Sequence, residues 1–234
     1  MNHSADAAPA FTLRNVRRDF PEWHLGRTEY ALWALDFDTT LIAARMAAAQ
    51  RHLAPWLLEG YTRQAHITLS LCGFPSALPC HADDFGAAQL AAQLAGLQRL
   101  RPLPFEIAIG GLATFSSVPY FTVQAADGPL QALRACLAAA PASGTPDDYV
   151  PHVTVGLYAD AWPLALVQHR LDAFLMCEPV CAQVTGIRLL AYVAADIGGP
   201  LHCLAHYDFQ SGVLHRKPGF PFAPASVWHG DCSP

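Results

Sequence analysis

The chain has 234 residues, a length that allows one large domain or two small ones. Hydrophobic residues make up 53% of it, which is ample material for a core, while its 14 basic and 19 acidic residues give a formal net charge of −5. That balance argues against a protein that coats nucleic acid through positive charge.

The sequence lacks the signals of export and of membrane insertion. Residues 1–6 contain no basic region followed by an apolar one, as a signal peptide would. No run approaches the ~20 apolar residues of a membrane span. The seven cysteines are odd in number and widely scattered, which indicates reduced thiols. We therefore expect a cytoplasmic protein with no membrane partner.

Cap and turn signals divide the first half of the chain into alternating strands and helices. Residues 1–27 lack periodicity and predict an extended lead-in. After it we expect, in order, a buried strand over 30–37, a helix capped by Asp38, Thr39 or Thr40 and running to about Leu53, a strand over 63–71, and a helix from Asp83 or Asp84 to about Leu100.

The second half roughly repeats this order. We expect strands over 105–109 and 120–124 joined through Gly110-Gly111, a helix from Asp127 to about Ala139, a strand over 151–157, a helix over 162–174, and strands over 180–193 and 201–209 that form a hairpin at 198–200. The duplication predicts two similar lobes, each with a sheet that lines a central cleft and helices outside. The tail after Gln210 is expected to be an ordered wrap or a loose end.

The two strands at corresponding places each carry a histidine followed two positions later by a threonine. They are His66-Ile67-Thr68 and His152-Val153-Thr154, and none of the other nine histidines has Ser or Thr at that spacing. Because side chains alternate across a strand, the histidine and threonine share one face and the apolar residue between them points the other way. By the same alternation Ser70 joins the face of His66, and Tyr158 that of His152. The alternative is two half-buried strands with satisfied histidines.

Two imidazoles and two hydroxyls facing a cleft suit acid-base chemistry on a phosphate. Opening a cyclic phosphodiester needs a base to deprotonate water and an acid to protonate the departing oxygen. Two histidines with ordinary pKa values of ~6.5 can hold opposite protonation states near neutrality. The hydroxyls of Thr68 and Thr154 can bond the non-bridging oxygens, whose charge grows in the transition state. We therefore take these four residues as the candidate catalytic set.

Other side chains are candidates for substrate binding, each with a structural alternative. Arg63 could approach a phosphate or be a solvated strand-end arginine. Arg188 and Tyr192 have the same parity on one strand and could bind phosphate and stack a base. Tyr120 or Phe121, whichever faces inward, could stack a base, with packing in the core as the alternative. Ser70 and Tyr158 fit a cleft wall better than a catalytic role.

The sequence shows no metal or nucleotide-loop motif. His202 and His206 share a face of one strand with Cys203 on the other, which does not make a closed ligand set. No Gly-rich loop ends in Lys-Ser or Lys-Thr, so an ATP-dependent ligase of the P-loop kind is not supported. We expect no metal and no cofactor.

The paired motifs, with Tyr149-Val150-Pro151 before the second and the late strand Val184–Leu190, resemble the 2H phosphoesterases, and among them the bacterial 2′-5′ RNA ligase-like proteins. The resemblance covers residues 28–210, leaving an extension over 1–27 and a tail over 211–234. It implies a bilobal α+β fold with two antiparallel sheets and pseudo-two-fold symmetry. It also implies hydrolysis, without a metal, of a nucleoside or RNA-terminal 2′,3′-cyclic phosphate to a 2′-phosphate. Some members catalyse the reverse 2′-5′ joining of RNA ends.

In this family the second histidine is usually the base for hydrolysis and the first the acid, so the resemblance implies these roles for His152 and His66; they exchange with reaction direction. The expected partner is a nucleotide or short RNA end, and the expected state is a monomer. Two alternatives stay open. One is a non-catalytic module that binds an RNA end or nucleotide. The other is a phosphoesterase acting on a small cyclic phosphate unrelated to nucleic acid.

Overall fold

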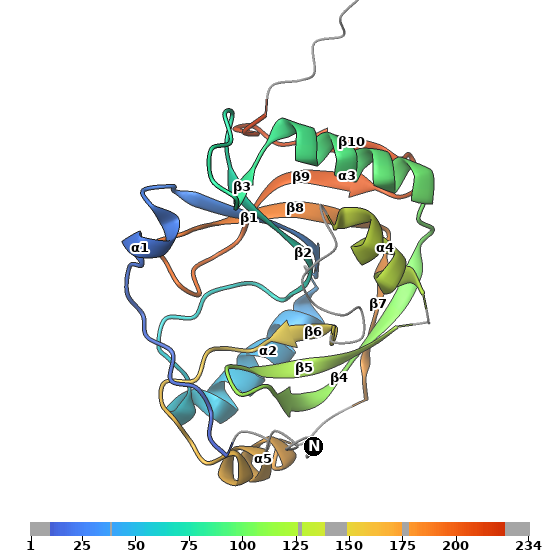
Figure 1. The fold of residues 1–234 in the computed structure, drawn as a ribbon. Helices are drawn as coiled ribbons and strands as arrows, with labels where there is room; N and C mark the ends of the chain where they lie inside the picture. Colours follow the sequence, from blue (N-terminus) through green and yellow to red (C-terminus); the bar gives the residue numbers. More distant parts are fainter. Residues whose placement is uncertain (1–9, 38, 126–127, 139–148, 175–177, 223–234) are drawn as a thin grey trace, which may run out of the picture.

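The computed structural model describes residues 10–37, 39–125, 128–138, 149–174 and 178–222, and its strands form two sheets (Figure 1). The large sheet has the order β10-β9-β8-β1-β2-β3 and the small sheet the order β6-β5-β4-β7. The strands are β1 Glu29–Asp36, β2 His66–Pro75, β3 Asp84–Phe85, β4 Phe105–Thr114, β5 Pro119–Ala125, β6 His152–Thr154, β7 Val180–Val184, β8 Gly186–Val193, β9 His202–Asp208 and β10 Val213–Arg216. Every pairing except the parallel β2–β3 is antiparallel, so the expected α+β fold with two antiparallel sheets is confirmed.

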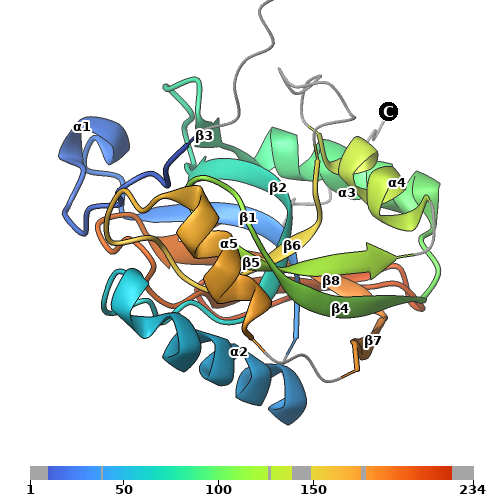
Figure 2. The ribbon, with the colours of Figure 1, turned by 90° about the horizontal axis from the view of Figure 1, so that it is seen from below.

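Helices flank both sheets, and the strands of the large sheet come from both ends of the chain (Figures 1 and 2). The helices are α1 Pro21–His24, α2 Thr40–Leu53, the short 3₁₀ helix η1 Ala54–Trp56, α3 Ala87–Leu100, α4 Pro129–Leu137 and α5 Leu164–Asp172. Helices α3 and α4 pack against each other over the large sheet, and α5 packs on the small sheet. Helix α2 is tied to the small sheet by Arg45, which donates to the carbonyl of Ile109 in β4 (3.2 Å).

The two faces of the large sheet differ in character. Trp33, Ile67 and Leu189 point toward α3 and α4 and belong to the main core. The opposite face carries a smaller cluster in which Leu32, Ala34, Leu190 and Leu201 are buried. Directly opposed residues of antiparallel strands share a face, and Asp36 opposes His66 while Ala34 opposes both Thr68 and Arg188. The first motif therefore lies on the face with the smaller cluster.

Three predicted elements are different in the structure. The strand expected over 180–193 is two strands, because β7 joins the small sheet and β8, after Thr185, joins the large one. Strand β4 continues through Gly110-Gly111, where its register with β5 shifts, instead of ending in a loop. Asp84 begins the short strand β3, and α3 begins only after Gly86, because the Asp84 carboxylate accepts the amides of Cys80 (2.8 Å) and His81 (2.9 Å) in the preceding loop.

Both ends of the described chain pack against the two-sheet body. Asn15 Nδ2 donates to the carbonyls of Ser117 (3.0 Å) and Tyr158 (3.1 Å), so the lead-in runs along the half of the chain that carries the small sheet. After Gln210 the chain forms β10, a strand that the sequence did not predict, and Phe222 packs edge-on against Phe85. Asp38 and Asp127, expected to begin helices, lie outside the described residues. No helix among the described residues is long and apolar enough to cross a membrane.

Candidate active site

His66 is the first residue of β2 and is held in one orientation. Its Nδ1–H donates to the carbonyl of Gln64 (2.8 Å), and the Gln64 amide is in turn fixed by Leu201, whose N–H donates to Oε1 (2.7 Å) and whose carbonyl accepts Nε2 (2.9 Å). A hydrogen bond at Nδ1 selects the tautomer whose Nε2 is a free acceptor. His66 therefore presents Nε2 to a ligand as a base would.

Burial sets the charge of His66. The residue is only 8% exposed, and desolvation lowers the pKa of its imidazole to about 4, with smaller contributions from the charges of Arg63 and His152. The Gln64 carbonyl opposes this shift. His66 is consequently neutral near pH 7 in the free protein.

His152 occupies the matching position in the other lobe. It is the first residue of β6, and its Nδ1–H donates to the carbonyl of Val150 (2.7 Å), again two residues earlier in the chain. The rings of Phe115 and Tyr120 lie edge-on to the imidazole, with centroids 5.0 and 5.4 Å away. The two histidines thus share one tautomer and one backbone setting, as the predicted duplication requires.

The two motif strands lie side by side although they belong to different sheets. Strands β2 and β6 are in contact, and the hydroxyl of Tyr149, just before β6, donates to the carbonyl of Thr68 (2.8 Å). Arg134 of α4 secures the junction, because it donates to the Leu69 carbonyl (2.8 Å) and lies over the Tyr149 ring (3.5 Å to the centroid). This junction holds the strands that begin with His66 and His152 against each other.

The predicted alternation holds within both motifs. Residues 66–68 pair in unbroken register with β1, and residues 152–154 with β5. Ile67 and Val153 are fully buried on the core side. Thr68 therefore shares the face of His66, and Thr154 that of His152 and Tyr120.

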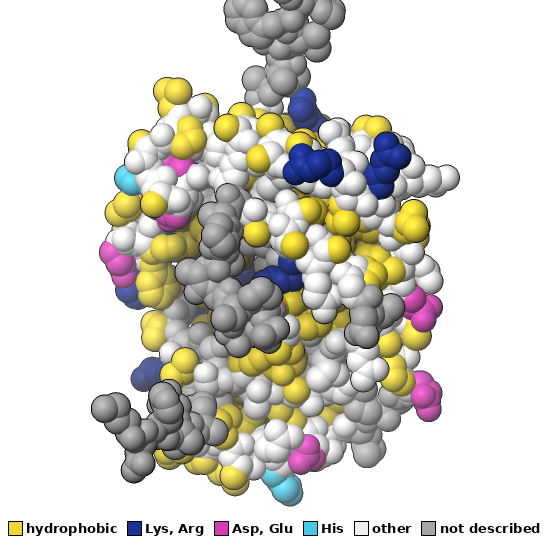
Figure 3. All heavy atoms as spheres, turned by 45° about the vertical axis from the view of Figure 1, so that its right-hand side comes forward, with side chains coloured by type: hydrophobic (Ala, Val, Ile, Leu, Met, Phe, Trp, Pro, Cys, Tyr) yellow, Lys and Arg dark blue, Asp and Glu magenta, His cyan; other side chains and the backbone are white. Residues whose placement is uncertain are grey.

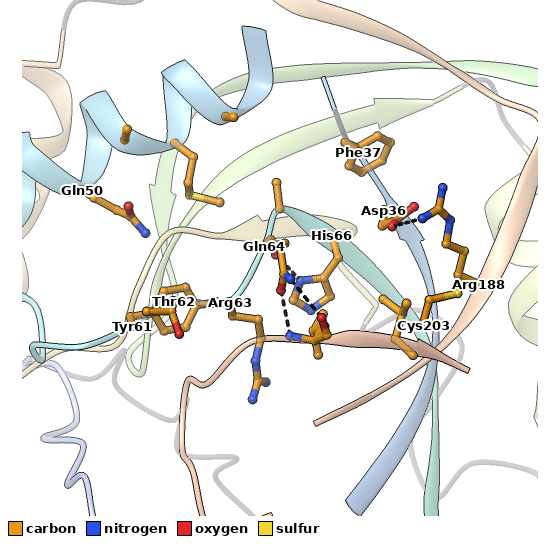
Figure 4. A pocket seen from close by; sticks show the side chains of 16 residues that line it. Asp36, Phe37, Gln50, Tyr61, Thr62, Arg63, Gln64, His66, Arg188 and Cys203 are labelled. Atoms are coloured by element: carbon orange, nitrogen blue, oxygen red, sulfur yellow. Dashed lines mark hydrogen bonds and ion pairs between the residues drawn. The ribbon is translucent and has the colours of Figure 1, made fainter. Parts of the chain in front are cut away.

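A cavity of about 500 Å³ opens beside His66, between α2 and the large sheet (Figure 4). Its walls come from α2, from residues 61–66, from the end of β1, from the middle of β8 and from the start of β9. At one end Arg188 Nη1 pairs with Asp36 Oδ2 at 2.8 Å. The cavity is large enough for a small-molecule ligand and joins the site at the first histidine.

Sequence comparison assigns the family. A family model described as the 2′-5′ RNA ligase superfamily matches residues 40–196, a span that contains both motifs. The chain belongs to the 2′-5′ RNA ligase superfamily. The resemblance to the 2H phosphoesterases is thereby confirmed, and the family is one of phosphoesterases and RNA ligase-like enzymes. Comparison with curated proteins found no match.

Solved structures with a similar fold come from bacteria and yeast. Apo LigT of E. coli is 17% identical, with a TM-score of 0.49 over 78% of this chain and 98% of that one. TT0787 of Thermus thermophilus is 16% identical, with a TM-score of 0.47 over 77% and 98%. Usb1 of Kluyveromyces marxianus is 12% identical, with a TM-score of 0.41 over 76% and 97%.

Ser70 and Tyr158, two of the candidate binding residues, lie away from the histidines. Ser70 opposes Trp33, because the register of β1 with β2 shifts between Trp33 and Ala34. The shift places Ser70 on the side of α4, where its hydroxyl donates to the Leu137 carbonyl (3.5 Å). Tyr158 lies beyond the end of β6 and is fully buried, with its hydroxyl 2.6 Å from Thr114 Oγ1. The expectation that these residues share the motif faces is wrong.

The other candidates are near the cleft. Tyr120 stacks on Phe115 and faces His152. Arg188 lines the cavity. Arg63 also lines it but extends away from His66 (Figure 4), with its guanidinium over the ring of Tyr192 (4.1 Å to the centroid). Arg63 and Tyr192 therefore form one unit at the cavity edge.

Sequence reasoning overlooked three groups at this site. Asp36, which pairs with Arg188 and opposes His66, stands as a lone carboxylate at the end of an apolar strand, and that contrast was a usable signal. Gln64 and Phe115 position the two histidines from loops, where no periodic pattern marks them. Among the described residues, no three His, Cys, Asp or Glu side chains gather as a metal site would require.

Proposed function

We propose that the protein hydrolyses the 2′,3′-cyclic phosphate of a nucleotide or of a short RNA end to a 2′-phosphate, with His66 and His152 as the acid-base pair and without a metal. The observation that carries this proposal is the pairing of two imidazoles on touching strands, each fixed by a carbonyl at Nδ1 and each followed by a threonine on the same face.

The reaction needs one proton removed and one supplied. Water attacks phosphorus while the bond from phosphorus to the 3′-oxygen breaks, so the base accepts the water proton and the acid protonates the departing oxygen. The two free Nε2 atoms supply these functions from opposite lobes. Thr68 and Thr154 donate hydroxyl hydrogen bonds to the non-bridging oxygens. If the 5′-hydroxyl of another RNA end takes the place of the water, the same steps form a 2′-5′ phosphodiester: the hydroxyl gives its proton to the base and attacks phosphorus, and the departing 3′-oxygen takes a proton from the acid.

The burial of His66 favours one assignment of roles. A general base must be neutral before the reaction, and desolvation lowers the pKa of His66 to about 4. We therefore propose His66 as the base for hydrolysis and His152 as the acid, the reverse of what the resemblance implies.

The charge of the molecule favours a small substrate. The formal net charge is −5, and in Figure 3 the described Lys and Arg side chains appear as separate spots on a face that also carries Asp and Glu side chains. Long RNA is usually held through several phosphate contacts with basic side chains. A mononucleotide or a short RNA end can be bound by the residues around the two histidines, without further phosphate contacts.

The proposal is tested by incubating the purified protein with the four nucleoside 2′,3′-cyclic phosphates in EDTA, with products separated by chromatography against 2′- and 3′-phosphate standards. We expect the 2′-phosphate, with one oxygen from labelled water. A 3′-phosphate product, or activity that EDTA abolishes, would contradict the mechanism. Nucleotide binding without turnover would favour the non-catalytic binding module instead.

A further inference from the structure

The turn between β4 and β5 carries one of the aromatic rings that contact His152. It spans residues 115–118, between the ends of the two strands. Phe115 lies edge-on to the imidazole, with the ring centroids 5.0 Å apart, and stacks on Tyr120 with a centroid distance of 4.2 Å. These two rings and the hydrogen bond at Nδ1 hold the imidazole of His152. The position of Phe115 therefore helps to fix the direction in which His152 points.

The lead-in holds this turn from the outside. The N–H of Leu13 donates to the carbonyl of Ser116 (2.7 Å). The side-chain amide of Asn15 donates through Nδ2 to the carbonyl of Ser117 (3.0 Å). Both carbonyls belong to the residues that directly follow Phe115, so the lead-in fixes the backbone of the turn next to the ring.

Asn15 reaches the turn a second time through Tyr158. Its backbone N–H (2.9 Å) and its Nδ2 (3.1 Å) both donate to the Tyr158 carbonyl. The buried Tyr158 hydroxyl lies 2.6 Å from Oγ1 of Thr114, the last residue of β4, and this Oγ1 donates to the Phe115 carbonyl (2.6 Å). Asn15 thus supports the turn from both of its ends.

The lead-in is anchored on either side of Asn15. Thr12 is only 2% exposed; its N–H donates to the Trp162 carbonyl (2.8 Å), and the Trp162 N–H donates back to Oγ1 (2.8 Å). On the other side, Arg17 pairs with Asp196 at 2.9 Å, in the connection between β8 and β9 of the large sheet. These two anchors keep Asn15 in place against the turn.

We propose that Asn15 is a positioning residue for His152, acting through the β4–β5 turn and Phe115, and that the lead-in is thereby part of the machinery of the site. The inference rests on the proposed function, in which His152 supplies a proton. Asn15 acts at one remove, because the turn stands between its side chain and the imidazole.

The kinetic test is a double-mutant cycle on nucleoside 2′,3′-cyclic phosphates. Asn15→Leu removes the Nδ2 bonds and should lower kcat by at least about tenfold, because a small misplacement of a reacting group slows the chemical step. In a His152→Ala protein the same substitution should change kcat by less than about twofold, since the two residues act as one unit. Equal losses in both backgrounds, or full activity of folded Asn15→Leu, would overturn the inference. Arg14→Leu, at an exposed position of the lead-in, is the matched control and should keep the wild-type kcat.

A second readout requires no turnover. Nuclear Overhauser effects from the His152 ring to the rings of Phe115 and Tyr120 report the two contacts directly. In Asn15→Leu, and in Asn15→Asp, which sets a carboxylate against two carbonyls, the effect to Phe115 should be lost. The effect to Tyr120 should remain, because that residue pairs with Thr154 in the sheet. An unchanged effect to Phe115 in either folded variant would overturn the inference.

The two proposals fail in different ways. Loss of the contact between Phe115 and His152 in the Asn15 variants, with no turnover by the wild type, would support the role of Asn15 and defeat the proposed hydrolysis. Turnover by the wild type, with kcat and the ring contact unchanged in the Asn15 variants, would support hydrolysis and defeat the role of Asn15.

Discussion

His66 combines a buried ring with the position that we propose for the reacting phosphate. Its Nδ1–H is committed to the Gln64 carbonyl, and the low pKa of its imidazole follows from desolvation. His152 has the same backbone setting in the second lobe, but aromatic rings surround it. The two side chains are chemically identical, and we propose that the burial of His66 makes it the base and leaves His152 as the acid.

The assignment of His152 as the acid predicts a selective rescue. In a cyclic phosphate whose 3′-oxygen is replaced by sulfur, the departing thiolate needs no proton. The defect of His152→Ala should then shrink by roughly 10–100-fold relative to the oxygen substrate, a large part of the contribution of a general acid. The defect of His66→Ala should stay the same, because the water must still be deprotonated. Rescue of His66→Ala alone would reverse the roles.

Burial of His66 also predicts how stability depends on pH. The pKa of this histidine is about 4 in the folded chain, below its ordinary value of ~6.5, so the unfolded chain takes up the proton first as the pH falls. Stability is therefore lost between about pH 6.5 and pH 4, and no further loss from this residue follows below that range.

The measurement is urea unfolding at pH 7 and pH 4.5. Between these values the wild type should lose about 2–3 kcal/mol more unfolding free energy than His66→Asn, which has no titrating ring. The exposed His169→Gln variant should behave as the wild type does. Identical pH dependence of wild type and His66→Asn would show that the folded protein does not keep this ring neutral.

The two motif strands, in which polar and apolar residues alternate regularly, were the best predicted part of the site. The three residues of each motif lie as a simple strand would place them, with Ile67 and Val153 buried and the polar residues on the opposite face. The prediction fails at Ser70, where the register between β1 and β2 shifts. A bulge is set by the partner strand and by packing of α4, and neither is encoded in the local pattern.

The buried side-chain amide of Gln93 links helix α3 to the large sheet and to α4. Gln93 Oε1 accepts the indole N–H of Trp33 (2.9 Å), and its Nε2 donates to the Leu137 carbonyl (2.9 Å), so one side chain joins β1, α3 and α4. Gln93→Ala removes both bonds in a buried setting and should lower the unfolding free energy by about 2–4 kcal/mol. Gln98→Ala, at an exposed position of α3, should cost far less. Equal effects in urea titrations would contradict this role.

At the scale of the whole molecule, the lobes are interlocked. Helix α4 follows β5 of the small sheet but packs with α3 on the large one, and the chain crosses between the sheets at Thr185. The internal duplication, the two lobes and the meeting of the motifs were predictable from the order of elements. The crossing at Thr185 and the strand β10 could not be predicted from that order. They depend on which edge strand of each sheet is left unpaired and can accept another strand.

The central claim is that one histidine from each lobe acts in a single metal-independent hydrolysis. The most direct test measures kcat on nucleoside 2′,3′-cyclic phosphates in EDTA for the wild type, His66→Ala, His152→Ala and the double variant, with His169→Ala as the exposed control. We predict a loss of about 10²–10⁴-fold in each single variant and little further loss in the double variant, since the residues act as one unit. Wild-type activity in either single variant would contradict the account.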